Sequence, residues 1–285
     1  MNWVPWLYFY AHQDFRRERD LVVVLYILVG ILSGTIAGLL GVGGGVIIVP
    51  ALIFLLGLQA TDPNVIPHVA VGSSLAVIVL TAVVSTLSHQ KRSAVIWRDV
   101  GLMSPGLLAG GLLAAFIASL LNAQNLKIAF TLFLLFIAAR MLFASDRDSE
   151  FRCRIPAPAM PLAGLIIGSV SALVGVGGGA MAVPLLLWCG RGIRKAVGTS
   201  AACTFPVALS GATGFMLAGR EMSGLPVYAT GFIYWPAVAG IALGSVLAVP
   251  LGAKLAHQLP KKTLTRLFAL LLIVVAVLIN IGRGG

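Results

Sequence analysis

The stretch "GLLGVGGGVIIVP" at residues 38–50 lies inside a long apolar run, and "ALVGVGGGAMAVP" at residues 172–184 lies inside another. Each copy places four glycines within five positions. After proline, glycine is the residue least favourable to a helix interior, costing about 1 kcal/mol relative to alanine. A membrane helix gains nothing from such a sequence unless it has to break there. The two copies therefore predict a helix break at the same place in each half of the chain.

The composition indicates an integral membrane protein. Hydrophobic residues make up 59% of the chain and charged residues only 10%, whereas soluble domains carry about 25% charged residues. The net charge is +11. We attribute it to cytoplasmic loops, which collect lysine and arginine in membrane proteins, rather than to binding of nucleic acid. We therefore expect an all-α polytopic protein in the lipid bilayer.

A helix that spans a membrane needs about 20 mostly apolar residues. Two apolar segments are too long for one straight helix, and these two contain the glycine runs. Each is expected to form a helix, a break and a shorter second helix. The eight apolar segments lie at roughly 21–57, 65–88, 100–121, 126–144, 160–190, 196–219, 229–253 and 263–281.

The chain contains an internal duplication. Residues 34–50 and 168–184 are identical at nine of seventeen positions, and "AVGSS" at 70–74 pairs with "AVGTS" at 196–200. Each repeat is expected to hold a glycine-broken first segment followed by three transmembrane helices. The predicted division is an interfacial N-terminal segment at 1–20, a first repeat at 21–144, a polar linker at 145–157 and a second repeat at 158–281.

The positions of lysine and arginine predict how the repeats are oriented. The central linker and the 190–196 loop are both basic, and basic loops are usually cytoplasmic, so the segment at 160–190 is expected to return to its own side. The likeness of the 21–57 segment favours the same course there, which places the N-terminus outside, against the preference of Arg16, Arg17 and Arg19. The alternative, in which only the 160–190 segment returns, places the N-terminus inside. An inverted repeat is thus favoured over a parallel one.

The chain lacks the residue patterns of several other classes of membrane protein. Every acidic residue lies in a loop or at the end of a segment, so no buried carboxylate is expected, which argues against a cation pump or an aspartyl protease. Neither a metal-ligand motif nor a cofactor motif occurs. His68 and His89 are expected to be surface residues at the membrane interface. We predict that the protein is not an enzyme.

A helix break at membrane depth exposes the N-terminus of the following helix, whose N–H groups and positive dipole end favour anions. We expect short helices at 46–56 and 180–187, with their N-termini aimed at one small anion. Hydroxyl groups in the "GSS" and "GTS" stretches would add hydrogen-bond donors. The alternative is that the glycines only allow close helix packing, as we expect for the G-x-x-x-G pairs at 34/38, 106/110 and 240/244.

These motifs resemble the sulfite exporter TauE/SafE family, over residues 20–281. The resemblance implies an inner-membrane carrier of sulfite, sulfonates or other small sulfur-containing anions, usually directed outward. The family motif matches the two glycine runs with their prolines. The predicted site also includes the four hydroxyl-bearing residues of the "GSS" and "GTS" stretches, as hydrogen-bond donors. The predicted substrate-binding residues are Gly41, Gly43, Gly44, Gly45, Pro50, Ser73, Ser74, Gly175, Gly177, Gly178, Gly179, Pro184, Thr199 and Ser200.

We therefore predict a multi-pass secondary transporter of the cell inner membrane, exporting a small sulfur-containing oxyanion by alternating access to a site between the repeats. The alternatives are an importer or passive channel for another small anion, and a membrane assembly component that transports nothing.

Overall fold

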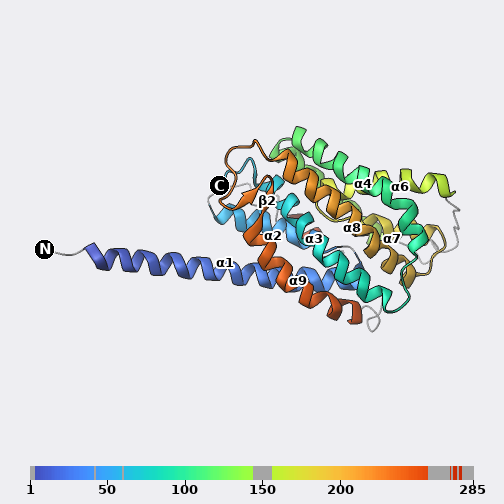
Figure 1. Ribbon diagram of the computed structural model, residues 1–285, viewed down its shortest axis with the longest axis horizontal. Helices are drawn as coiled ribbons and strands as arrows, with labels where there is room; N and C mark the ends of the chain where they lie inside the picture. The colour runs from blue at the N-terminus through green and yellow to red at the C-terminus, as the bar shows by residue number, and fades with distance from the viewer. Residues whose placement is uncertain are drawn as a thin grey trace.

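The computed structural model describes residues 4–41, 43–59, 61–143 and 156–255, with 270, 272–274 and 276–277. These residues form a bundle of helices with one short hairpin (Figure 1). The helices are α1 (Val4–Leu40), α2 (Gly45–Leu58), α3 (Ile66–Gln90), α4 (Trp97–Leu120), α5 (Ala123–Phe143), α6 (Met160–Leu173), α7 (Gly179–Trp188), α8 (Ile193–Ala218) and α9 (Trp235–Leu255), with a 3-10 turn at Ala157–Ala159 before α6; the hairpin pairs β1 (Ala229–Thr230) with β2 (Ile233–Tyr234).

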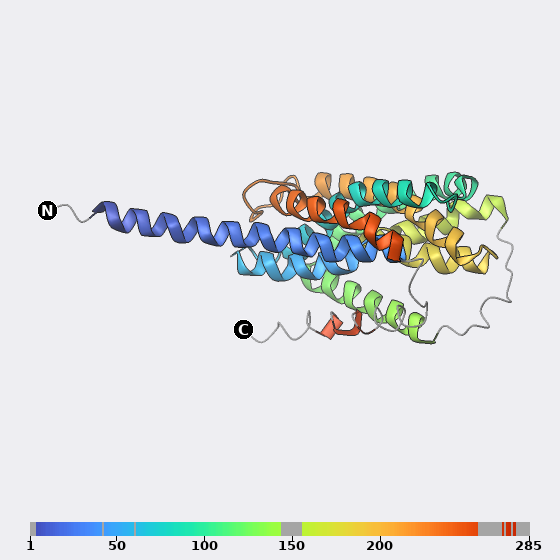
Figure 2. The same cartoon turned by 90° about the horizontal axis from the view of Figure 1, so that it is seen from below.

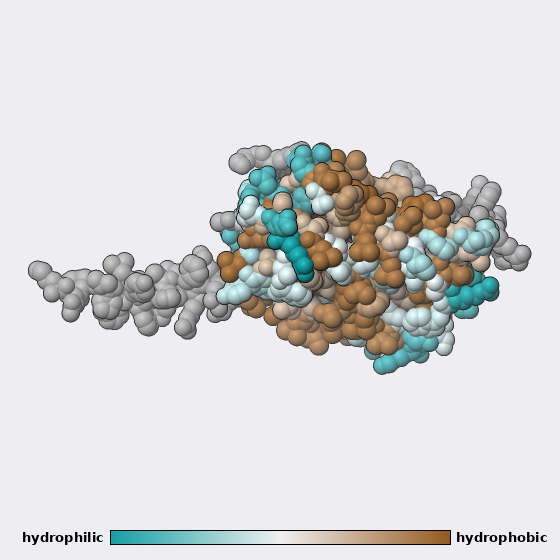
Figure 3. Space-filling view, turned by 45° about the horizontal axis from the view of Figure 1, so that its top comes forward, coloured by the Kyte–Doolittle hydropathy of each residue, from teal (hydrophilic) through white to brown (hydrophobic). Residues whose placement is uncertain are grey.

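The described residues confirm a multi-pass membrane protein. Five of their helices are long and apolar enough to cross a bilayer: the part of α1 at Leu21–Leu39, and α3, α4, α8 and α9. Apolar residues cover the middle of the face in Figure 3, and polar residues gather toward its two ends. Exposed leucines such as Leu120 and Leu247, with about 70% of their surface accessible, fit contact with lipid.

The two long apolar segments double back at the glycine runs, as the sequence predicts. After the break at 41–44, α2 returns along α1. This is shown by the Gln59 side chain just beyond α2, which donates a hydrogen bond to the Tyr26 hydroxyl of α1 (2.8 Å). The α6–α7 pair is arranged in the same way. The residue that follows α7 by three positions, Arg191, pairs with Asp99 in the first turn of α4, and α6 begins beside the same half of α4.

The two halves exchange their outer helices. α1 of the first half packs along α9 of the second, and α6 of the second half packs along α4 of the first (Figures 1 and 2). Small residues let the backbones meet, and this confirms the packing role predicted for the G-x-x-x-G pairs. A Cβ added at these glycines would overlap the facing helix: Gly34 meets Ser245, Gly38 meets Val249, Gly106 meets Pro161, Gly110 meets Leu165, Gly240 meets Tyr26 and Gly244 meets Ile27.

α3 and α8 occupy equivalent places in the two repeats and cross in the centre of the bundle. A Cβ added at Gly211 of α8 would lie 2.9 Å from the Leu75 Cδ1 of α3. Gly72, three residues before Leu75, approaches Phe215, four residues after Gly211. Contacts that move backward along α8 as they move forward along α3 show that the two helices are antiparallel.

The structure corrects one boundary and leaves others as predictions. The segment expected at 229–253 begins with the hairpin, and its helix starts only at Trp235. α1 passes through residue 20 without interruption. Most of the segment at 263–281, most of the linker at 145–157 and the side chains of residues 1–20 lie outside the described residues.

Adding a methyl group at Gly106 should destabilise the protein, because the new Cβ would overlap the carbonyl of Pro161 on α6. Overpacking of this kind costs about 1–3 kcal/mol, so we expect Gly106→Ala to lower the melting temperature in detergent by several degrees. Gly101→Ala is the control, because nothing lies within 4 Å of that position on the same helix. Equal melting temperatures for the two variants would contradict the close contact between α4 and α6.

Candidate functional site

The two glycine runs adopt the same unusual backbone. Three glycines in each run have positive φ: Gly41 (+67°), Gly43 (+85°) and Gly44 (+76°) in the first, and Gly175 (+70°), Gly177 (+80°) and Gly178 (+88°) in the second. Residues with a side chain pay about 1–2 kcal/mol for this left-handed region. The runs therefore break the helix by conformation, as the sequence predicts, and the break is the same in both repeats.

Each break ends at the N-terminus of a short helix. In α2 the first helical hydrogen bonds are donated by Ile47 and Ile48 to the Gly44 carbonyl, at 3.0 and 3.3 Å, so the N–H groups of Gly45 and Val46 precede the hydrogen-bonded ladder. In α7 the matching bonds run from Met181 and Ala182 to the Gly178 carbonyl. The N–H groups of Gly179 and Ala180 precede that ladder in the same way.

The two breaks lie against one another in the core. A Cβ added at Gly43 would approach the Thr204 Cγ2 at 3.2 Å and the Ile78 Cγ2 at 3.3 Å, and one added at Gly177 would approach the same two methyl groups at 2.9 Å. A Cβ added at Gly45 would overlap the Gly175 carbonyl oxygen. Ile78 and Thr204 are almost fully buried. The N-termini of α2 and α7, one from each repeat, therefore start from a shared central region.

The second hydroxyl of each "GSS" or "GTS" stretch holds the break of the other repeat. The Ser74 hydroxyl donates to the Gly175 carbonyl at 2.9 Å. The Ser200 hydroxyl lies 3.4 Å from the Gly41 carbonyl and 2.9 Å from the Val197 carbonyl of its own helix. These hydrogen bonds are reciprocal, and they satisfy carbonyl groups that the breaks release from the helices.

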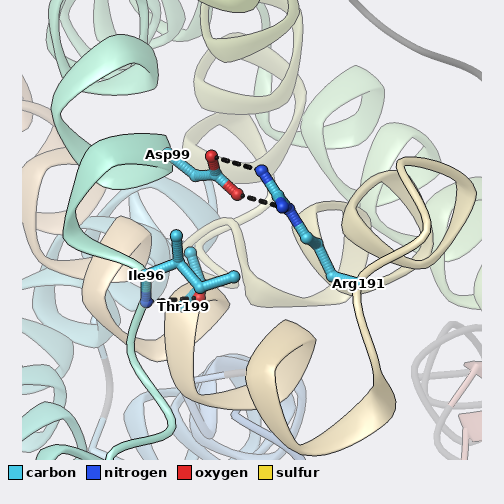
Figure 4. A network of polar contacts seen from close by, with 4 residues as sticks. All are labelled: Ile96, Asp99, Arg191 and Thr199. Carbon is cyan, nitrogen blue, oxygen red and sulfur yellow. Dashed lines mark hydrogen bonds and ion pairs between the residues drawn. The ribbon is translucent and has the colours of Figure 1, made fainter.

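The first hydroxyl of each stretch has a different structural partner. Ser73 accepts a hydrogen bond from the Tyr234 N–H at 2.9 Å, and Thr199 accepts one from the Ile96 N–H at 3.0 Å (Figure 4). Tyr234 and Ile96 directly precede α9 and α4. The side chains predicted as one anion-binding set thus form two pairs, and each pair joins one repeat to the other.

The two motif prolines lie inside the short helices rather than at their N-termini. Pro50 is in α2 and Pro184 is in α7, and both are half-buried. Each proline lacks the N–H that would bond the carbonyl four residues earlier, at Val46 and at Ala180. The prolines therefore leave the carbonyl groups of Val46 and Ala180 without that helical partner.

The expectation that no carboxylate is buried is wrong for Asp99. This residue is in the first turn of α4, is 1% exposed, and accepts two hydrogen bonds from Arg191, at 2.9 and 3.0 Å (Figure 4). Its position at the end of an apolar segment suggested an accessible side chain. Only the fold brings the loop after α7 over it and supplies the positive charge that permits burial.

The expectation that His68 and His89 are surface residues is also wrong, because they are 4% and 3% exposed. The His68 Nε2 lies 3.1 Å from the carbonyls of both Ala118 and Leu121, so it donates to the C-terminal end of α4, where carbonyl groups lack helical partners. The ring stacks on Phe232, with ring centroids 5.1 Å apart. His68 therefore ties α3, α4 and the hairpin together.

Removing the Ser74 hydroxyl should destabilise the second break, because the Gly175 carbonyl would lose its hydrogen bond in a buried site. Such a loss costs about 1–3 kcal/mol, and Ser74→Ala should lower the melting temperature in detergent. Ser88→Ala is the matched control on α3, since Ser88 bonds only the Val84 carbonyl of its own helix. A Ser74→Ala variant as stable as Ser88→Ala would show that the contact between repeats contributes nothing.

Comparison with known proteins identifies the family of the chain. Residues 26–279 match the model of the family described as sulfite exporter TauE/SafE. A probable membrane transporter protein of Haemophilus influenzae is 33% identical over 90% of this chain and 97% of its own length. The probable membrane transporter protein YunE of Bacillus subtilis is 25% identical over 88% of this chain and 95% of its own. No solved structure gives a significant match. The chain therefore belongs to the sulfite exporter TauE/SafE family of membrane transporters.

Proposed function

We propose that the protein is a secondary transporter that exports a small sulfur-containing oxyanion, such as sulfite or an organosulfonate, by alternating access to a site between the repeats. The observation that carries this proposal is the meeting of the two glycine breaks, which starts α2 and α7 from one buried region. The description of the family as sulfite exporters and the names of the relatives support it.

The chemistry of the central region suits an anion. The N–H groups of Gly45, Val46, Gly179 and Ala180 lie at the positive ends of two helix dipoles, an arrangement that favours negative charge. Among the described residues, Asp99 is the one buried acidic side chain, and Arg191 neutralises it. The site would therefore bind oxygen atoms through backbone N–H groups, without a carboxylate to repel them.

We also propose that the two repeats are inverted in the membrane. The antiparallel packing of the equivalent helices α3 and α8 supports this, because a two-fold axis along the membrane normal would make them parallel. α1 and α6, which open the two repeats, run in opposite directions along the long axis of the bundle (Figures 1 and 2). Inverted repeats allow one half to rock against the other around a fixed central site.

The distribution of charge supports an orientation. The Asp99–Arg191 pair joins the basic 89–99 and 190–196 loops, and Arg92 donates to the Ala253 carbonyl near Lys254 of α9 (2.8 Å), so these basic stretches gather at one end. By the positive-inside rule this end faces the cytoplasm, and the N-terminus of α1 is outside. In the inner membrane, a potential that is negative inside would then drive anion export.

The transport proposal is tested with purified protein in liposomes loaded with radiolabelled sulfite. We expect efflux that accelerates when a potassium diffusion potential makes the interior negative, and that protein-free liposomes lack. Accumulation of sulfite beyond its electrochemical equilibrium, driven by the gradient of a second solute, would distinguish a coupled carrier from a passive channel. Absence of sulfite and sulfonate flux from correctly folded protein would contradict the proposal and favour an assembly component.

Deleting one N–H group at the break tests the proposed site. Ala180→Pro removes an N–H that precedes the helical ladder of α7, so the helix keeps all its hydrogen bonds. Ala180→Val adds a side chain of similar size and keeps the N–H. One hydrogen bond to a charged group contributes about 1.5–3 kcal/mol, so we expect sulfite affinity, measured by calorimetry, to be roughly 10- to 100-fold weaker in Ala180→Pro than in Ala180→Val. Equal affinities would exclude this N–H from the site.

A further inference from the structure

The ion pair between Asp99 and Arg191 joins the two repeats at the basic end of the bundle (Figure 4). Asp99 belongs to the first turn of α4, in the first repeat, and Arg191 belongs to the loop between α7 and α8, in the second. The guanidinium binds both carboxylate oxygens, at 2.9 and 3.0 Å. The Arg191 side chain is 39% exposed and that of Asp99 is 2% exposed, so the arginine lies over the carboxylate on the solvent side.

A second polar contact occupies the equivalent place at the opposite end. There Gln59, the residue directly after α2, reaches Tyr234, the residue directly before α9. The Tyr234 hydroxyl lies 3.4 Å from the Gln59 Oε1, and the Gln59 Nε2 donates to the Tyr26 hydroxyl at 2.8 Å. α2 and α9 correspond to α7 and α4 in the other repeat. At each end, therefore, the segment after a short broken helix is fastened to the start of the long helix that the other repeat contributes.

We propose that these two contacts are the closures of the transport path and that they break alternately. When the Asp99–Arg191 pair breaks, the basic end opens while the Gln59–Tyr234 contact keeps the other end shut. When the Gln59–Tyr234 contact breaks, the ion pair keeps the basic end shut. This rests on the alternating access proposed above. The two closures differ in chemistry. The closure at the basic end is a bidentate ion pair, whereas the contact at the other end is between neutral groups.

The chain contains its own reporter of opening at the basic end. Cys203 lies on α8 one turn after Thr199, whose hydroxyl binds the backbone beside Asp99, and it is 0% exposed. Opening of this end should let an aqueous thiol reagent reach Cys203. Replacing Cys153 and Cys189 by serine leaves Cys203 as the one cysteine of the chain.

The experiment measures the rate at which the anionic reagent MTSES modifies Cys203 in this background, in detergent-purified protein that is monodisperse by gel filtration. We expect Asp99→Asn and Arg191→Gln each to raise the rate at least tenfold. Arg194→Gln is the matched control, because it removes an exposed positive charge three residues away, and it should leave the rate unchanged. Gln59→Leu breaks the opposite closure and should not raise the rate, whereas general loosening of the bundle would raise it in every variant.

Unchanged modification rates in Asp99→Asn and Arg191→Gln would overturn the proposal, as would an equal increase in Gln59→Leu. If the Asp99 and Arg191 variants do not fold, Arg191→Lys gives the answer. Lysine keeps the positive charge but loses the bidentate geometry, so Cys203 should be modified faster than in the parent, and an unchanged rate would contradict this closure. The modification experiment contains no substrate. A failure of sulfite transport in liposomes and a failure of this closure are therefore separate results.

Discussion

The fold depends on one constraint: backbone that leaves a helix inside a membrane must find its hydrogen bonds within the protein. Both repeats break their first segment in the bilayer, and each break is held by the other repeat. Ser74 binds the Gly175 carbonyl, and Ser200 approaches the Gly41 carbonyl. Each half thus supplies a hydroxyl group to a carbonyl that the break in the other half releases. The outer helices are exchanged in the same way, with α1 on α9 and α6 on α4.

The same constraint brings the helix N-termini together. The left-handed glycines turn the chain back after α1 and after α6, and α2 and α7 then start from positions that share Ile78 and Thr204 as neighbours. Two positive helix ends in a buried region need a negative partner or a hydrogen-bond acceptor. A small oxyanion provides both, and it does so without a charged side chain. In the proposed site, backbone N–H groups bind the anion, and the side chains hold the backbone in place.

Features set by local sequence could be predicted, and features set by contacts between distant segments could not. The glycine runs predict the break and the start of the short helices, and the G-x-x-x-G pairs predict where helices touch. Both features depend on residue size and backbone freedom. The hydroxyls of Ser73 and Thr199 were predicted as donors to an anion, and nothing in the sequence indicated that they also accept N–H groups of the other repeat. Asp99 is buried because Arg191, distant in sequence, covers it. Similarly, His68 is buried beneath the hairpin, and no periodicity in the sequence predicts that burial.

The location of a bound anion tests whether the substrate lies between the two helix N-termini. Selenite has the shape and charge of sulfite, and its selenium gives an anomalous X-ray signal. Crystals soaked in selenite should show one strong anomalous peak between the N-termini of α2 and α7, within hydrogen-bond distance of the N–H groups of Val46 and Ala180. A peak confined to the basic end, beside Arg191, with none between the two breaks would contradict the account.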